Sequence, residues 1–189
     1  MKKIKTIFDR DWEGNRKVVD KYVIDPELFY IATATEKLDG TNVRITVRNH
    51  TPVRLEKRRN PDKLQKAKGI EYPWYVDADQ YGPEDKYIWD ALAHTNLSDI
   101  PDGEWSGEAV GVNIQGNPLN LTENKIIFFT LGQCPEFDNV PTDFEGLSKW
   151  LPNQKSKVGN NCGIEGIVWH CSDGSMMKIK TKDFNPDLR

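Results

Sequence analysis

Two stretches with the composition of β-strands, 31–38 and 43–47, meet in the segment Glu36-Lys37-Leu38-Asp39-Gly40-Thr41-Asn42-Val43-Arg44. Asp-Gly is a favoured two-residue turn between antiparallel strands. The pattern therefore predicts a β-hairpin that turns at Asp39 and Gly40. Lys37 is then either an ordinary hairpin lysine or a reactive group, and the rest of the chain has to distinguish these two interpretations.

As a nucleophile, Lys37 would attack phosphorus through its side-chain amine, which reacts only in its neutral form. A free lysine, with a pKa of about 10.4, is almost wholly protonated at pH 7. Burial and neighbouring cations lower the pKa of a lysine, and enzymes activate such nucleophiles in this way. This interpretation therefore requires further lysines, phosphate ligands, and carboxylates for ribose or metal.

Length and charge restrict the class of protein. A chain of 189 residues is most simply one domain, 1–189, with a proper core. A net charge of −3 produces no global basic field, so a nucleic-acid surface has to be a local patch. No apolar run approaches the length of a membrane span, so we expect a cytoplasmic protein without membrane contact.

The cysteines and histidines exclude two further classes. Cys134, Cys162 and Cys171 are odd in number and widely spaced, which argues against a disulfide framework. The three histidines are scattered and have no metal-binding spacing, so a structural zinc site is not expected.

The order of predicted elements is rich in strands with two inserted helices, which indicates an α+β fold. Beyond the hairpin, strands are expected at 17–24, 53–57, 104–110, 125–131, 164–170 and 176–180, and helices at 83–97 and 142–151. Pro83 suits the first helical position, and Thr142 with Glu145 has capping-box spacing. The segment 125–131 is apolar on both faces, so we expect a central strand there.

A run of seven basic residues follows the predicted hairpin. They are Arg54, Lys57, Arg58, Arg59, Lys63, Lys66 and Lys68. Such a run is usually a solvated surface, and contact with phosphates is the competing interpretation. We assign no mechanism to residues 1–30.

The end of the chain supplies the lysines that an activated Lys37 needs. Lys178 and Lys180 lie two residues apart, so in a strand they share one face while Met177 and Ile179 point the other way. Glu165 is placed in an otherwise apolar strand, where a carboxylate is costly unless it is paired or bound to metal. Glu108 has the same character and is flanked by glycines that permit close approach of a ligand.

Several short motifs therefore follow one another in a fixed order. They are Lys37-Leu38-Asp39-Gly40, Arg58-Arg59-Asn60, Gly107-Glu108, Ile127-Phe128-Phe129, Glu165-Gly166-Ile167-Val168 and Lys178-Ile179-Lys180. This ordered set resembles the covalent nucleotidyltransferase superfamily of ATP-dependent polynucleotide ligases and RNA capping enzymes. The stretch from Glu36 to Asn42 is similar to the RNA ligase branch.

By this resemblance, Lys37 attacks the α-phosphate of ATP, releases pyrophosphate and holds AMP as a phosphoramide. Lys178 and Lys180 would stabilise the charge that develops on the α-phosphate. Glu165 would hold a divalent metal ion, Mg²⁺ or Mn²⁺, which neutralises the triphosphate and orients the leaving group.

The resemblance also implies contacts to the nucleoside. Glu108 would bind the ribose hydroxyls, and either Arg58 or Arg59 would contact ribose or phosphate. The neighbouring Asn60 favours Arg59.

Further implied contacts concern the base and the second substrate. Thr35 and Glu36 lie near the base in such pockets. Phe129 or Phe128 would stack on the adenine, and Asn42 would help to position the incoming 5′-phosphate end.

The resemblance implies an α+β, ATP-grasp-like ligase catalytic domain whose antiparallel sheets flank an ATP cleft. Because nine residues follow Lys180, no OB-fold domain is expected. The implied activity is ATP-dependent RNA ligation in RNA repair, which joins 5′-phosphate and 3′-hydroxyl ends through lysyl-AMP and an adenylylated RNA end.

Two alternatives stay open. One is a GTP-dependent capping-type guanylyltransferase, which the missing OB-fold disfavours. The other is a non-catalytic RNA- or nucleotide-binding module, which the presence of Lys37, Glu165, Lys178 and Lys180 disfavours. The RNA substrate and the oligomeric state do not follow from the sequence, nor does it decide between a minimal stand-alone ligase and a catalytic fragment.

Overall fold

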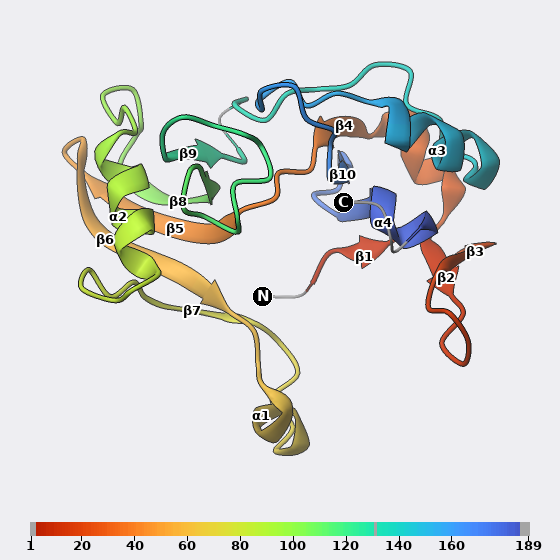
Figure 1. The fold of residues 1–189 in the computed structure, drawn as a ribbon, viewed down its shortest axis with the longest axis horizontal. Helices are drawn as coiled ribbons and strands as arrows, with labels where there is room; N and C mark the ends of the chain where they lie inside the picture. The colour runs from red at the N-terminus through yellow and green to blue at the C-terminus, as the bar shows by residue number, and fades with distance from the viewer. Residues whose placement is uncertain (1–2, 131, 186–189) are drawn as a thin grey trace. The chain divides into compact units, whose positions relative to one another are not determined.

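Strands supply most of the regular structure of this chain, which a computed structural model describes for residues 3–130 and 132–185 (Figure 1). Residues 39–134 form one compact unit, which we call the central unit. Residues 4–38 together with 135–185 form a second, the terminal unit. The chain passes from one unit to the other after Leu38 and again after Cys134.

The central unit is built on a five-stranded antiparallel sheet. Its strands, in spatial order, are β7 (Trp74–Asp77), β6 (Thr51–Arg59), β5 (Thr41–Arg48), β8 (Gly103–Val110) and β9 (Lys125–Phe128). Helix α2 (Asp85–Ala93) lies over one face of this sheet, and the short helix α1 (Lys63–Ala67) lies in the connection between β6 and β7 (Figure 1).

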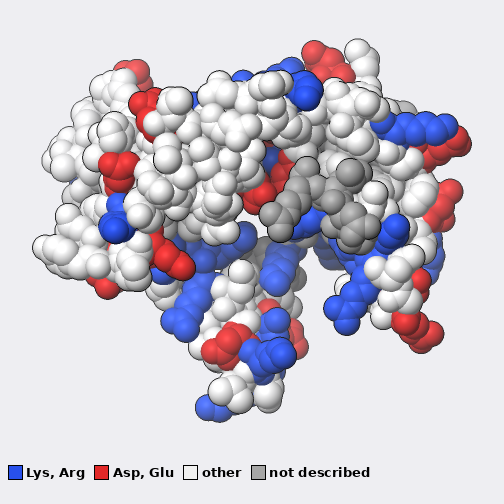
Figure 2. Space-filling view, viewed as in Figure 1, with Lys and Arg blue, Asp and Glu red and all other residues white. Residues whose placement is uncertain are grey.

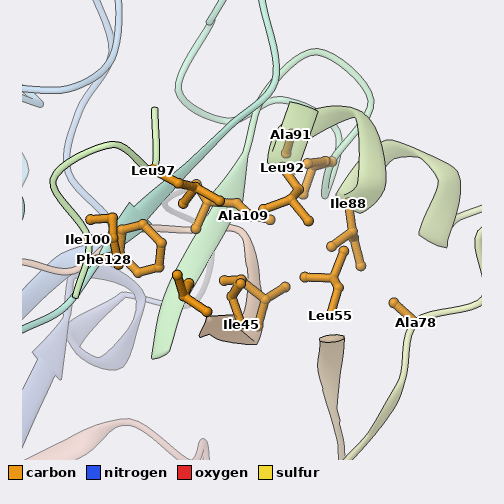
Figure 3. Close-up of a cluster of buried hydrophobic side chains, with 14 residues drawn as sticks. Ile45, Leu55, Ala78, Ile88, Ala91, Leu92, Leu97, Ile100, Ala109 and Phe128 are labelled. Carbon is orange, nitrogen blue, oxygen red and sulfur yellow. The ribbon is translucent and has the colours of Figure 1, made fainter. Parts of the chain in front are cut away.

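The core of the central unit lies between α2 and the covered face of the sheet. Ile88, Ala91 and Leu92 of α2 point toward strand residues such as Ile45 and Leu55 (Figure 3). The residues of β5 alternate, because successive strand side chains point to opposite faces. The fully buried residues of β5 belong to this core, and its half-buried residues line the other face of the sheet.

The terminal unit contains a four-stranded sheet and a separate hairpin. In the sheet the order is β1 (Lys5–Thr6), β11 (Met176–Lys180), β10 (Gly166–His170) and β4 (Thr33–Glu36). β1 and β11 are parallel, and the other pairs are antiparallel. The hairpin pairs β2 (Phe8–Arg10) with β3 (Val18–Tyr22).

Short helices complete the terminal unit. They are η1 (Pro26–Ile31), α3 (Phe144–Trp150), η2 (Leu151–Asn153) and α4 (Thr181–Phe184). Leu147 of α3 and Leu151 of η2 pack with Ile167 and Ile179 of the sheet in a second core. Phe8 joins this core edge-on to Phe144, with ring centroids 5.2 Å apart, a favoured aromatic geometry. No helix in the described part of the chain is both long and apolar enough to cross a membrane.

The predicted hairpin at Asp39-Gly40 is wrong. β4 pairs with β10, whereas β5 pairs with β6 and β8, so the two strands around Asp39-Gly40 belong to different sheets. The signal of an Asp-Gly turn is local, and long-range pairing overrides it here. A Cβ atom at Gly40 would lie 2.2 Å from the carbonyl oxygen of Ala109, so glycine allows close approach of β8.

Both predicted helices exist with different ends. α2 begins at Asp85 rather than Pro83, which lies in the preceding turn, and it ends at Ala93 rather than at residue 97. Its end is held by the hydroxyl of Thr95, which donates to the carbonyl of Ala91 and accepts the backbone N–H of Ile126 of β9.

The predicted cap of the second helix is also wrong. Asp143, not Thr142, is the N-cap residue of α3, and its carboxylate accepts the backbone N–H of Gly146 at 2.7 Å. Aspartate caps at least as well as threonine, and it lies one residue closer to the helix.

The segment expected as a central strand lies at an edge. β9 is the last strand of the five-stranded sheet, and its described part ends at Phe128. Ile126, Ile127 and Phe128 are nevertheless buried, which explains the apolar pattern. Burial of both faces and central position are separate properties, and the sequence reports only the first. Residue 131 lies outside the described residues.

The two adjacent phenylalanines differ in burial, and this makes a stability prediction. Phe128 is fully buried in the core of the central unit, whereas Phe129 is half-buried and outside that core. We expect Phe128→Ala to lower the free energy of unfolding by about 3–5 kcal/mol, because it leaves a cavity. The matched variant Phe129→Ala should cost about 1 kcal/mol or less. Chemical denaturation of both variants measures the difference, and equal losses would contradict this account of the core.

Candidate active site

Three lysines and one glutamate gather in the terminal unit. Lys178 and Lys180 lie on β11, where they are half-buried on the same side, and Met177 and Ile179 are buried in the core. The predicted alternation along this strand is confirmed. Lys37 directly follows β4 and is anchored by its backbone N–H, which donates to the carbonyl of Gly166 at 2.9 Å.

Glu165 joins two of these lysines. One of its carboxylate oxygens accepts from Lys37 Nζ at 2.7 Å, and the other accepts from Lys180 Nζ. Glu165 directly precedes β10 and is not part of the strand in which it was expected. Burial by itself raises the pKa of Glu165, but the positive charges of Lys37 and Lys180 outweigh burial and hold this pKa below its usual value.

Lys178 is the third lysine of this cluster, and its contacts differ from those of Lys37 and Lys180. It makes no salt bridge with any residue that the structure describes. Its burial, and then the charges of Lys37 and Lys180, lower the pKa of Lys178 from 10.5 to about 8. The sequence had predicted that neighbouring ammonium groups activate Lys37, and this stays a prediction.

Close backbone approach holds the cluster together. In the register of β10 and β11, Gly166 is opposite Lys180. A Cβ atom at Gly166 would lie 2.0 Å from the carbonyl oxygen of Ile179, so a side chain there would push the two strands apart. Glycine at this position therefore keeps Glu165 close to Lys180.

The residues before Lys37 bind protein groups. Glu36 is only 2% exposed, and its carboxylate accepts from the hydroxyl of Ser156 and from the backbone N–H of Lys157 at 2.8 Å. Burial raises the pKa of Glu36, against the effect of these hydrogen bonds. Thr35 Oγ1 lies 3.0 Å from His170 Nε2. Glu36 thus anchors the loop at 156–157, and its expected position near a base stays a prediction.

A second set of expected site residues lies on the face of the central sheet opposite the core. Asn42 is paired across the strands with Glu108, and paired residues project to the same side. The hydroxyl of Tyr75 donates to Asn42 Oδ1 at 2.9 Å and lies 3.2 Å from Ser106 Oγ. This contact leaves the donor end of the Asn42 amide for another partner.

Register separates the two arginines that the sequence left open. Arg58 is paired with Tyr75, so it shares the face of Asn42 and Glu108, whereas Arg59 is paired with Trp74 on the opposite face. The geometry thus favours Arg58, although the sequence had favoured Arg59.

Burial separates the two phenylalanines in the same way. Phe128 is part of the core (Figure 3), whereas Phe129 is half-buried and donates its backbone N–H to Ser106 at 3.0 Å. The ring of Phe128 is enclosed by protein, so Phe129 is the one that can meet a ligand.

A charged network underlies this face. Arg44 binds Glu56 through two hydrogen bonds of 2.7 and 2.9 Å, and its guanidinium lies 4.5 Å from the ring centroid of Tyr75. Glu56 is 1% exposed, so it depends on this pairing. Tyr75 is in this way held against both Arg44 and Asn42. The sequence analysis did not identify Arg44 or Tyr75, and a tyrosine in a short strand carries no local signal of such a role.

A divalent metal ion such as Mg²⁺ needs oxygen ligands from the protein or the substrate. No group of three or more His, Cys, Asp or Glu residues suited to a metal occurs among the described residues. Mg²⁺ is usually bound through one or two carboxylates together with substrate phosphates and water. Glu165 fits such an arrangement as one ligand.

Sequence reasoning missed the residues of a basic pocket in the terminal unit. This pocket, of about 520 Å³, contains Lys178 and Lys180 together with residues of the β2–β3 hairpin and α4. Arg10 and Arg16 are the arginines that the hairpin contributes. The available signal was the pair of arginines around the Gly14-Asn15 turn, in a segment to which we had assigned no mechanism.

Comparison with known proteins identifies relatives of this chain. The model of the RNA ligase 1 family matches residues 90–185. RNA ligase 1 of Mus musculus is 30% identical over 149 residues, which cover 71% of this chain and 43% of the mouse protein. RNA ligase 1 of Pongo abelii is 36% identical over 103 residues, or 53% of this chain and 29% of that protein. The chain therefore spans less than half the length of these relatives.

Solved structures show a related fold. A Naegleria gruberi RNA ligase with PPi matches with a TM-score of 0.54 and 15% identity, over 83% of this chain and 52% of that one. A mutant of the same ligase with ATP and Mn matches with a TM-score of 0.52 and 13% identity, over 98% of this chain and 62% of that one. These likenesses concern the mixed α+β fold with its antiparallel sheets. The family model covers just over half of the chain, and this chain therefore belongs to the RNA ligase 1 family.

Proposed function

We propose that this protein is an ATP-dependent RNA ligase that uses Lys37 as its nucleophile. The observation that carries the proposal is the cluster in which Glu165 bridges Lys37 and Lys180 beside the half-buried Lys178. Membership of the RNA ligase 1 family supports it. So do the solved Naegleria gruberi RNA ligase structures of the same fold, one with PPi and another, of a mutant, with ATP and Mn.

In the first step, neutral Lys37 Nζ attacks the α-phosphorus of ATP. A P–N bond forms, the bond from the α-phosphorus to the bridging oxygen breaks, and pyrophosphate leaves with that electron pair. Nζ gives up a proton in the process. In the structure Lys37 Nζ is hydrogen-bonded to Glu165, so this contact has to loosen before Nζ attacks.

Lys178 and Lys180 would act on the charge of the reacting phosphate. Both ammonium groups come from one face of β11, so they are already oriented when ATP binds. Preorganised charges of this kind stabilise a transition state without reorganisation at the moment of reaction. A divalent metal ion held by Glu165 would add positive charge at the phosphates, which also favours the neutral form of the attacking amine.

Residues of the central unit would bind the nucleoside. Glu108 is proposed to accept from the ribose hydroxyls, Arg58 to contact ribose or phosphate, and Phe129 to stack on the adenine. The common face of Glu108 and Arg58 and the only partial burial of Phe129 support these roles. The ATP cleft flanked by antiparallel sheets stays a prediction.

The later steps would join RNA ends. AMP passes from Lys37 to an RNA 5′-phosphate, and a 3′-hydroxyl then attacks the adenylylated end and releases AMP. Asn42 would help to position the 5′-phosphate through its amide donor, which Tyr75 orients. The requirement for 5′-phosphate and 3′-hydroxyl ends is part of this proposal.

The arm formed by β6, α1 and β7 would contact RNA. Figure 2 shows Lys and Arg side chains over this arm. Lys63, Lys66 and Lys68 are exposed, and α1 is held in shape by a capping box between Asp62 and Gln65. Exposed lysines on a capped helix can reach phosphates without a change in the backbone.

The covalent step makes the first prediction of this function. Intact-protein mass spectrometry after incubation with Mg²⁺ and ATP should show an AMP-sized adduct, which is absent from Lys37→Ala and present in the surface control Lys149→Ala. With GTP we expect no adduct. A GMP-sized adduct would move the proposal to capping chemistry. No adduct with either nucleotide, from protein that is not already adenylylated, would overturn catalysis.

The depressed pKa of Lys178 predicts a pH dependence of nucleotide binding. At pH 7 roughly nine-tenths of Lys178 is charged, and the charge is lost as the pH rises through about 8. Affinity for an ATP analogue with an α,β-methylene bridge, which cannot transfer AMP, should therefore fall by up to about tenfold between pH 7 and 9. Lys178→Arg keeps its charge over this range and should not show the fall. An identical profile in calorimetric titrations of both proteins would contradict the role of Lys178.

The arm makes a prediction about RNA affinity. In the triple variant Lys63→Glu, Lys66→Glu, Lys68→Glu, RNA should bind more weakly, and the slope of log affinity against log salt should fall by roughly two for single-stranded RNA. A control variant with Lys21→Glu and Lys149→Glu changes exposed lysines elsewhere. If the triple variant melts normally and binds RNA with an unchanged salt slope, the arm has no part in RNA binding.

A further inference from the structure

The basic pocket of the terminal unit has a chemically uniform wall. It has a volume of about 520 Å³ and is lined by Thr6, Arg10, Asn15, Arg16, Lys178, Lys180, Lys182 and Asp183. All of these residues are charged or polar. No aromatic or aliphatic residue among the described residues lines it, so charged and polar groups dominate what the pocket offers to a ligand.

The charge of this wall is strongly positive. Five of its residues are basic and one is acidic. The acidic residue, Asp183, is already engaged, because it forms a salt bridge with Arg10 and accepts the backbone N–H of Lys180 at 2.9 Å. Burial, and then the charges of Lys37 and of the wall residue Lys180, lower the pKa of Lys178, so positive charges already repel one another at this end of the pocket. A multiply charged anion would relieve this repulsion.

The β2–β3 turn is built to hold Arg16 at the pocket. The carboxylate of Asp11 accepts the backbone N–H of Gly14 at 2.9 Å, and its carbonyl accepts the backbone N–H of Arg16 at 2.9 Å. Arg10 in turn donates to the carbonyl of Arg16 at 3.0 Å. Because the backbone of Arg16 is fixed at both its N–H and its carbonyl, its side chain extends from a defined position.

Arg10 also connects the β2–β3 turn to β11, the strand that carries Lys178 and Lys180. Arg10 binds Asp183, and Asp183 caps the end of β11 at Lys180. On the other side, Thr6 of β1 is paired in parallel register with Lys178. The hairpin and the lysines of β11 thus form one connected structure within the terminal unit.

We propose that this pocket binds the pyrophosphate part of ATP and that Arg16 and Lys182 neutralise pyrophosphate as it leaves. The inference rests on the proposed function. Pyrophosphate concentrates several negative charges in a compact group without a base, which matches a small, polar and strongly basic wall. An RNA backbone carries only one charge per nucleotide, so it matches this concentration of positive charge less well.

In this proposal Lys178 and Lys180 contact both the α-phosphate and the leaving pyrophosphate. They face the α-phosphate, and they also line the pocket for the leaving group. When the bond between the α-phosphorus and the bridging oxygen breaks, the electron pair moves onto pyrophosphate, and Arg16 and Lys182 take up the added negative charge. In reverse, a pyrophosphate oxygen attacks the phosphorus of lysyl-AMP, the P–N bond breaks, Nζ regains a proton and ATP is released.

The test uses the exposed residues of the wall, which can be changed without disturbing the core. The variants are Arg16→Ala, Lys182→Ala and the double variant, and Lys21→Ala is the matched control. Lys21 belongs to the same hairpin, is exposed, pairs with Asp9 and does not line the pocket. Two measurements are made on each protein: the Kd for inorganic pyrophosphate by calorimetry, and the KM for pyrophosphate in the release of ATP from adenylylated enzyme.

For the double variant we expect both constants to rise about tenfold or more, because two charge-assisted contacts are lost. Each single variant should show a smaller rise, and Lys21→Ala should match the wild type. Sealing of RNA that is adenylylated in advance needs no pyrophosphate, so it should fall much less than ATP release.

Each other outcome has a defined meaning. Unchanged constants in the double variant, or no binding of pyrophosphate by the wild type, would overturn the proposal. An equal loss in the sealing of pre-adenylylated RNA would also overturn it and assign the pocket to RNA phosphates. If the wild type formed no lysyl-AMP but its affinity for pyrophosphate still depended on Arg16 and Lys182, the ligase proposal would fail and the anion pocket would stand.

Discussion

The arrangement of the charged residues in the terminal unit depends on the two ion pairs that the carboxylate of Glu165 forms. This carboxylate accepts from Lys37 after β4 and from Lys180 of β11, while Glu165 itself precedes β10. A strand near the start of the chain and two consecutive strands near its end are therefore joined at one charged group. Half-buried ammonium groups repel one another and lose hydration, so they can share this space only because a carboxylate lies among them. Lys178, which lacks such a partner among the described residues, has the lowered pKa.

The central unit divides its tasks between the two faces of one sheet. One face packs against α2 and supplies the core, and the other carries Asn42, Arg58 and Glu108. The second face is held by polar contacts, with Glu56 buried under Arg44 and with Tyr75 between Arg44 and Asn42. A rigid sheet thereby presents polar side chains at fixed spacing on this face.

The sequence was most informative where the chemistry depends on local spacing. The alternation of Lys178 and Lys180 with buried Met177 and Ile179 follows from the two-residue period of a strand, and the structure has it. The motif order identified Lys37 and Glu165 as residues of one site, and they do meet. The α+β class likewise followed from the order of elements. In each case the signal lies within a few residues or in the chain order.

Tertiary structure decided what depends on partners far away in the chain. Only pairing with β10 separates β4 from β5 and removes the expected hairpin at Asp39-Gly40. Only register distinguishes Arg58 from Arg59, and only packing distinguishes Phe128 from Phe129. The basic pocket combines a hairpin near the start of the chain with β11 near its end. The sequence by itself thus determined the candidate site residues and their local spacing. Strand pairing and burial determined which side chains face one another, because these are long-range interactions.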